Sequence, residues 1–397
     1  MSNAQVDTLS NRLTSLDAFR GITIAAMIIV NDPGSWDAIY VPLKHAEWHG
    51  WTPTDLIFPF FLFIVGVSIS ISLGRYTEPG TVPRDVYARI IRRSLLLFAI
   101  GVFLNALPLY DFAKHEWIDL GTLRIMGVLQ RIAICYLVSS FIFLFSDWRQ
   151  QLIISVGLLL IYWALMTWID IPECLRTTVD LKPCNLAAYL DRMLLTTDHM
   201  WKESKVFDPE GLLSTIPAIA STMAGVLTGS WLQKFAKGRV TSDEGENSSS
   251  KPIFGLFVFI TLLIAGLIWD RWFPINKNLW TSSYVVFTTG VALCFLAFLY
   301  WLIDIKGFVR WATPFVIFGT NAIALYIGAS VMESFLGAIV VGGDRSDPVT
   351  LQGWIFKNIF RSWAEPVNAS LAYAVCFTLV WLLLMWLLYR KRIFIRL

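Results

Sequence analysis

Two histidines stand four residues apart, directly ahead of a long apolar run. They belong to the stretch KHAEWHGWTPTDLIFPFFLFIVG, residues 44–66. An imidazole has an ordinary pKa near 6.5, so His45 and His49 can take up or release a proton near neutral pH. A half-buried imidazole between the carboxylate of Glu47 and the indole of Trp48 would suit a general base.

The same spacing could serve a metal ion if the two histidines shared a helix face. Gly50 and Pro53 follow at once and disfavour a continuous helix through this stretch. No further cluster of Cys and His residues in the sequence supports a zinc site. We therefore expect no metal here.

Two arginines lie seven residues apart in the apolar stretch LRIMGVLQRIAICY. Seven residues are nearly two helical turns, which predicts that Arg124 and Arg131 point to one helix face about 10 Å apart. A guanidinium at membrane depth needs an anionic partner. The partner could be a phosphate of a ligand, or a structural carboxylate such as Asp55 or Glu333.

Two asparagines stand at the end or in the middle of apolar runs. Asn31 precedes Pro33 in IIVNDPG, so its amide could cap a helix or orient a substrate. Asn321 lies in FGTNAIALY, where it could hydrogen-bond between helices or contact a substrate. The stretch FDPEGLL, residues 207–213, places two acids before an apolar run, which is typical of a helix N-terminus.

The five cysteines form no CxxC pair. Cys174 and Cys184 share one polar segment, and a disulfide between them is expected if that segment faces an oxidising compartment.

These residues must be positioned by membrane helices. The 397 residues are 56% hydrophobic and only 15% charged, whereas soluble domains carry about 25% charged residues. Recurrent runs of about 20 apolar residues predict an all-α polytopic membrane protein, a single domain covering residues 1–397. The ten expected spans are 17–35, 55–74, 94–110, 124–145, 151–170, 212–232, 252–270, 281–303, 311–339 and 371–390.

Charge bias predicts how these spans are oriented. Lys and Arg are about twice as dense in the segments on one side as on the other, and the richer side is expected to be cytoplasmic. Both termini and the polar linker 234–251 then lie in the cytoplasm, and residues 44–54 lie outside.

Several motifs together resemble one family. LDAFRGITIAAMIIVND, the stretch 44–66, LRIMGVLQRIAICY, DPEGLLSTIPAIA, INKNLWTSSYV and FGTNAIALY are similar to the heparan-α-glucosaminide N-acetyltransferase family of transmembrane acetyltransferases, and most closely to its bacterial NagX-like branch. The resemblance reaches from about residue 13 to about residue 326. It implies acetyl transfer from cytosolic acetyl-CoA to the amine of a terminal glucosamine across the membrane.

The resemblance also implies site residues. The family's active histidine matches His45 in HAEWHG, and its functional asparagine matches Asn31. Around them we expect substrate contacts from His49, Trp48, Glu47, Asp55 and Asn321. We further expect Arg124, Arg131, Arg89, Arg92 and Arg93 to hold the phosphates of CoA, since guanidinium groups pair well with phosphates.

Two other functions remain open on the sequence. An inner-membrane transporter of N-acetylglucosamine would also need about ten spans and a polar core, although no inverted repeat is visible. A scaffold without chemistry would not need the polar residues inside the spans. The predicted location is the bacterial inner membrane, and the resemblance favours a homodimer.

Overall fold

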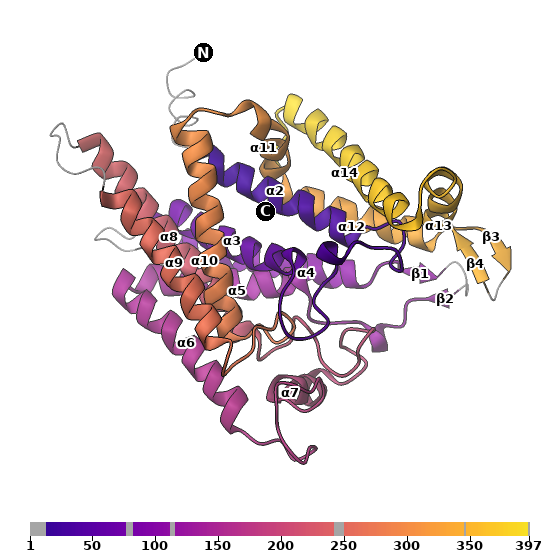
Figure 1. Ribbon diagram of the computed structural model, residues 1–397, viewed down its shortest axis with the longest axis horizontal. Helices are drawn as coiled ribbons and strands as arrows, with labels where there is room; N and C mark the ends of the chain where they lie inside the picture. The colour runs from indigo at the N-terminus through magenta and orange to yellow at the C-terminus, as the bar shows by residue number, and fades with distance from the viewer. Residues whose placement is uncertain (1–12, 77–81, 112–115, 242–249, 345–346, 396–397) are drawn as a thin grey trace. The chain divides into compact units, whose positions relative to one another are not determined.

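The structure is a computed structural model that describes residues 13–76, 82–111, 116–241, 250–344 and 347–395. Most of these residues are helical (Figure 1). The helices are α2 (Thr14–Asn31), α3 (Ile57–Leu73), α4 (Arg84–Asn105), α5 (Val128–Phe145), α6 (Trp148–Trp168), α7 (Leu186–Leu195), α8 (Thr215–Thr241), α9 (Ser250–Trp269), α10 (Ser282–Leu299), α11 (Thr313–Thr320), α12 (Ala322–Ala338), α13 (Leu351–Ile355) and α14 (Pro366–Arg390).

Short elements connect these helices. Two hairpins are formed by β1 (Tyr110–Asp111) with β2 (Glu116–Trp117) and by β3 (Val340–Asp344) with β4 (Asp347–Thr350). The short helical turns are η1 (Val41–Leu43), η2 (Pro53–Leu56), η3 (Gly74–Tyr76), η4 (Leu120–Thr122), η5 (Tyr300–Ile305), η6 (Arg310–Ala312) and η7 (Phe356–Phe360).

The chain divides into two compact units, a division that the sequence did not indicate. Unit 1 consists of Met1–Val41, Leu293–Gly337 and Val349–Arg396, and unit 2 of Pro42–Ala292 and Ala338–Pro348 together with the terminal Leu397. One of the points at which the chain passes from one unit to the other, Ala292 to Leu293, lies inside α10. Both histidines of the opening motif belong to unit 2, whereas Asn31 and Asn321 belong to unit 1.

In unit 2, α3 packs against α8, and two glycines allow the close approach. A Cβ atom on Gly66 would lie 1.9 Å from the carbonyl oxygen of Thr222, and one on Gly225 would lie 2.0 Å from that of Phe63. Only a residue without a side chain fits at such a contact. Small residues at helix crossings are characteristic of membrane bundles, where packing rather than water exclusion drives association.

In unit 1, two glycines likewise allow α2 to pack closely against α11. A Cβ atom on Gly21 would lie 1.7 Å from the carbonyl oxygen of Phe315, and one on Gly319 would lie 2.1 Å from that of Asp17. Helix α14 packs against both of these helices. Glycine contacts between backbones therefore fix one crossing in each unit.

Within the described residues, six helical segments are long and apolar enough to cross a membrane. They are Thr14–Asn31, Pro53–Tyr76, Val128–Phe145, Trp148–Trp168, Ser282–Ile305 and Pro366–Arg390. A multi-pass membrane protein follows from this pattern. Each of the ten predicted spans overlaps a helix, but α4 carries several charges in its first turns, so the count of ten stays a prediction.

The ninth predicted span is not one straight helix. The segments Arg310–Thr320 and Ala322–Ala338 meet at Asn321 with a bend of 73°. If this bent pair crosses the membrane once, it makes a seventh span.

The predicted linker 234–251 is shorter than expected. Residues 234–241 are the last turns of α8, and α9 begins at Ser250. The intervening residues 242–249 lie outside the described part of the chain.

Candidate active site

His45 forms a pair with a buried carboxylate. Its Nδ1 lies 2.6 Å from Oδ1 of Asp55. The Asp55 side chain is 1% exposed, whereas the His45 side chain is 48% exposed. A carboxylate only accepts, so we assign the proton of the neutral imidazole to Nδ1. Nε2 is then the basic nitrogen, and it makes no hydrogen bond with any described residue.

Local sequence explains why Asp55 points back at His45. The chain enters the membrane through η2, where Thr52 precedes the turn and Asp55 is its third residue. Oδ2 of Asp55 accepts the backbone N–H of Thr52 at 2.9 Å and that of Ala46 at 3.0 Å. This is the carboxylate half of a capping box. The capping carboxylate thus also orients the imidazole ten residues earlier.

The backbone of Asp55 is held from a second helix. The hydroxyl of Tyr284, on α10, donates to the carbonyl oxygen of Asp55, and Tyr284 is fully buried. Upstream, the hydroxyl of Thr54 donates to the carbonyl oxygen of Pro42 at 3.1 Å. The loop that carries His45 is therefore fixed at both ends by hydrogen bonds within unit 2.

His49 faces a different carboxylate. Its Nε2 lies 3.1 Å from Oδ1 of Asp180, and its Nδ1 lies 3.4 Å from the amide nitrogen of Asn276. Both ring nitrogens are therefore occupied, unlike those of His45. Gly50, directly after it, has φ +90°, a backbone conformation that favours glycine. Glu47 is exposed, so Asp55 rather than Glu47 supplies the carboxylate beside His45.

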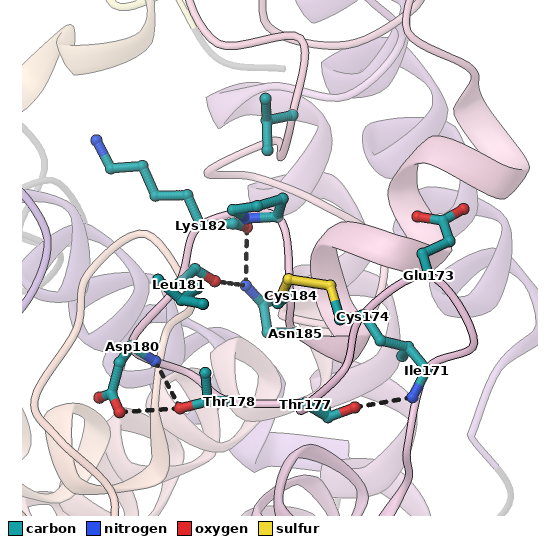
Figure 2. The surroundings of a disulfide bond; sticks show 12 residues. Ile171, Glu173, Cys174, Thr177, Thr178, Asp180, Leu181, Lys182, Cys184 and Asn185 are labelled. Carbon is teal, nitrogen blue, oxygen red and sulfur yellow. Dashed lines mark hydrogen bonds between the residues drawn. A yellow bond between two sulfur atoms is a disulfide. The ribbon is translucent and has the colours of Figure 1, made fainter.

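Trp48 fastens this loop to the segment closed by a disulfide. Its indole Nε1 donates to the carbonyl oxygen of Val179 at 2.8 Å, and Nζ of Lys182 lies 5.7 Å from its ring centre. Cys174 and Cys184 form the disulfide that closes this segment (Figure 2).

Arg124 lies in a network of buried acids. Its Nε and Nη2 bind both carboxylate oxygens of Asp208 at 2.9 and 2.6 Å, and Nη2 also contacts Glu210 at 2.6 Å. Burial alone would raise the pKa of Glu210, but Arg124, Lys277 and Arg131 outweigh it and lower the pKa to about 2. Two protein carboxylates thus occupy the guanidinium that was predicted to meet a phosphate.

The prediction that Arg124 and Arg131 share a helix face is wrong, because α5 begins only at Val128. Arg131 is fully buried. Its Nη2 donates to Ser214 and to the carbonyl oxygen of Gly211, and its guanidinium lies 5.1 Å from the ring of Trp280. Of the two carboxylates considered as partners of Arg131, Asp55 is paired with His45 instead, and Glu333 belongs to unit 1.

The first turns of α4 carry the remaining arginines. Arg89 bonds with Asp85 at 3.0 Å and with the hydroxyl of Tyr76 at 3.2 Å. Arg93 lies over the ring of Tyr136 at 5.0 Å, and Arg92 is exposed. Arg89 and Arg92 are exposed, whereas Arg131 is fully buried.

In unit 1, the two asparagines differ. Asn31 is the exposed last residue of α2. Asn321 is 1% exposed, and its side chain donates to the carbonyl oxygen of Ile393 at 3.0 Å and accepts from the N–H of Ile395 at 2.8 Å. Asn321 therefore fastens the C-terminal segment at the bend between α11 and α12.

Over the described ranges, no three His, Cys, Asp or Glu side chains gather in a way that could hold a metal ion. The class of protein is thus a multi-pass helical membrane protein with a histidine–carboxylate pair in a loop ahead of a membrane helix.

A sequence profile of the catalytic region of heparan-alpha-glucosaminide N-acetyltransferase matches residues 12–264, and the chain belongs to this family. It is 30% identical to heparan-alpha-glucosaminide N-acetyltransferase from Homo sapiens and 29% identical to that from Mus musculus. The alignments cover 98% and 97% of this chain, but only 60% of each relative.

Sequence reasoning missed the ion pairs of Arg124. Asp208 and Glu210 were interpreted as helix-start acids, but α8 begins only at Thr215. The sequence offered a signal in two acids separated by one proline, and one arginine, in apolar surroundings. Pairing them needed the fold, because they are more than 80 residues apart.

Proposed function

We propose that the chain transfers an acetyl group from acetyl-CoA to the amine of a glucosamine-type sugar, with His45 as general base. One observation carries the proposal: the hydrogen bond between Asp55 and Nδ1 of His45 leaves Nε2 as a basic nitrogen on a half-exposed ring. Family membership and the names of the relatives support the reaction class.

In the proposed reaction, the neutral amine of the sugar attacks, and Nε2 of His45 accepts the proton that the amine nitrogen loses. The amine nitrogen forms a bond to the thioester carbonyl carbon, the carbon–sulfur bond breaks, and the CoA thiolate leaves. The proton on His45 then neutralises the thiolate. Asp55 stabilises the imidazolium and keeps Nε2 directed at the substrate, which general-base catalysis requires.

We favour direct transfer in a ternary complex. An acetyl group on a half-exposed imidazole would be open to hydrolysis by water. Holding donor and acceptor together also converts the reaction into an effectively unimolecular one. The covalent alternative, with acetyl carried on His45, predicts label retained on the protein after incubation with labelled acetyl-CoA and no acceptor.

The other residues receive secondary roles in this proposal. Asn31 is proposed to orient the reacting groups, as its match to the family motif implies. His49, Trp48 and Glu47 are proposed to contact the acceptor from the loop that carries His45, while Asp55 acts through His45. The bonds of Arg124, Arg131 and Asn321 within the protein favour structural roles for all three.

CoA phosphates are proposed to bind at the start of α4, on the cytoplasmic side of an inner membrane. Replacing Arg89, Arg92 and Arg93 with Ala should raise the KM for acetyl-CoA and leave the KM for the acceptor nearly unchanged. A charge-assisted contact contributes about 1.5–3 kcal/mol. Unchanged acetyl-CoA binding in the triple variant would contradict this part of the proposal.

A single assay tests the reaction itself. Purified protein in detergent, supplied with acetyl-CoA and glucosamine, should release CoA thiol and yield N-acetylglucosamine. A transporter of amino sugars would produce neither product, so the absence of acceptor-dependent thiol would reject the proposal.

A further inference from the structure

The disulfide-closed segment lines a cavity of about 630 Å³ on the surface of unit 2, which is widely open to solvent. Its lining includes Glu173, Leu175, Arg176, Thr178, Asp180 and Leu181, together with the disulfide. Sites for small ligands commonly enclose about 300–1,000 Å³. The cavity therefore has room for a sugar ring.

The lining is chemically mixed in a way that suits carbohydrate. The carboxylates of Glu173 and Asp180 can accept hydrogen bonds from sugar hydroxyls, and the guanidinium of Arg176 can donate to them. Leu175 and Leu181 are exposed and offer apolar contacts to the C–H face of a ring. Arg176 makes no hydrogen bond or ion pair with another described residue, so all of its donors remain for a ligand.

The cavity shares a wall with the histidine loop. Asp180 lines the cavity and also contacts Nε2 of His49 at 3.1 Å. The neighbouring residue Val179 accepts the indole N–H of Trp48. A ligand in the cavity would thus lie beside the loop that carries His45.

The walls are held in place before any ligand arrives (Figure 2). The buried side chain of Asn185 donates to the carbonyl oxygens of Leu181 at 3.1 Å and Lys182 at 3.0 Å. Its Oδ1 accepts the N–H of Ala188 at 2.9 Å and so caps the start of α7. The hydroxyl of Thr178 donates to Asp180 at 2.9 Å. Preorganised walls of this kind reduce the ordering cost of binding.

A second set of contacts fixes the opposite edge. Arg192 on α7 donates to Glu173 at 2.6 Å and to the carbonyl oxygen of Pro183 at 3.1 Å. The N–H of Ile171 donates to the hydroxyl of Thr177 at 2.8 Å. Together with the disulfide, these hydrogen bonds hold the segment in one conformation.

We propose that this cavity binds the sugar ring adjacent to the amino sugar that is acetylated, with Arg176 as a specificity-determining residue. This inference rests on the proposed function and adds to it a subsite for the second ring of the acceptor. The terminal ring is presented to His45, and the next ring occupies the cavity.

The test compares acceptors of one and two rings. Arg176→Ala should raise the KM for a glucosamine disaccharide on the order of tenfold, as expected for losing one charge-assisted hydrogen bond. The kcat for both acceptors and the KM for glucosamine should stay unchanged, because a single ring does not reach the cavity. Arg271→Ala is the matched control, since Arg271 is exposed and outside the cavity lining. Equal KM changes for both acceptors, or none, would overturn the inference.

A binding measurement separates this inference from the proposed function. Ligand-observed NMR with the glucosamine disaccharide on His45→Ala protein reports binding without turnover. Binding should be retained in His45→Ala and weakened on the order of tenfold in the His45→Ala, Arg176→Ala double variant. Equal binding by the two proteins would reject the subsite whether or not the wild type acetylates. Absence of acetyl transfer by the wild type, with this binding difference intact, would reject the reaction alone.

Discussion

Asp55 determines which ring nitrogen of His45 carries the proton. Its carboxylate lies 2.6 Å from Nδ1 and is held by two backbone N–H groups. His49 differs because Asp180 and Asn276 contact its two nitrogens. The two imidazoles, equivalent in spacing on the sequence, thus have different chemical environments.

Asp55→Asn tests the orienting role. An amide can present its N–H₂ to Nδ1 and favour the wrong tautomer, and it cannot stabilise the imidazolium by charge. We expect kcat to fall roughly 10²–10⁴-fold, while the KM for acetyl-CoA stays nearly unchanged.

Tyr284→Phe is the companion variant, because it removes a hydrogen bond to the Asp55 backbone and leaves the carboxylate in place. Its kcat loss should be smaller. Equal losses in the two variants would mean that only the fold of the loop matters.

Glu210→Gln tests the ion pairs of Arg124. The pKa of Glu210 is lowered from 4.5 to about 2 in the folded protein. Between these pH values the unfolded state binds more protons, so the stability from this carboxylate is present above pH 4.5 and lost as the pH falls toward 2. Near neutral pH the variant should be destabilised by about 1.5–3 kcal/mol, because Arg124 loses one charge-assisted contact and keeps its pair with Asp208.

Thermal unfolding in detergent at several pH values measures this effect. The difference between wild type and Glu210→Gln should shrink as the pH falls from 4.5 toward 2. A difference that stays constant across that window would contradict the ion-pair account.

Site residues that belong to a local motif could be predicted from the sequence, whereas contacts between residues far apart along the chain could not. His45 could be predicted from its motif. Asp55 was predicted to be a site residue, but as one that contacts the substrate. Its orienting role depends on the turn at Pro53 and on the capping geometry of Thr52, which spacing alone does not fix. Arg124 and its acids could not be paired, because no local pattern connects residues more than 80 positions apart.

The apolar runs of the sequence predicted the positions of the helices well, since a lipid-facing helix must be apolar over its whole length. The break at Asn321 was not predicted. An apolar run continues on both sides of it, and the bend becomes intelligible only with the hydrogen bonds from Asn321 to Ile393 and Ile395. Those partners are more than 70 residues away along the chain.

Gly225→Val tests the close crossing of α3 and α8. The added side chain would meet the backbone oxygen of Phe63, which cannot rotate away. Overpacking of this kind costs about 1–3 kcal/mol or more, so the apparent Tm in detergent should fall.

Gly157→Val is the matched control, because a Cβ atom at Gly157 on α6 meets no atom within 4 Å. That variant should keep the wild-type Tm within a degree or so. Similar behaviour of both variants would show that the crossing tolerates a side chain.

The sidedness of the reaction is a property of the whole molecule. The charge bias predicts that residues 44–54 face outward and residues 304–310 inward. In a variant with Cys135, Cys294 and Cys376 replaced by Ser, Glu47→Cys should react with an impermeant maleimide added to intact spheroplasts. Lys306→Cys should react only after lysis. The reverse pattern would contradict the orientation.

The role of His45 as general base is tested by the turnover of His45→Ala, measured beside that of His49→Ala. Both side chains lie in a loop outside the helices, so each variant should remain folded, and monodisperse protein in detergent is the condition for comparison. We expect His45→Ala to lower kcat for acetyl transfer by about 10²–10⁴-fold, and His49→Ala to lower it far less. Normal turnover in His45→Ala, or equal losses in the two variants, would contradict the assignment of His45 as the general base.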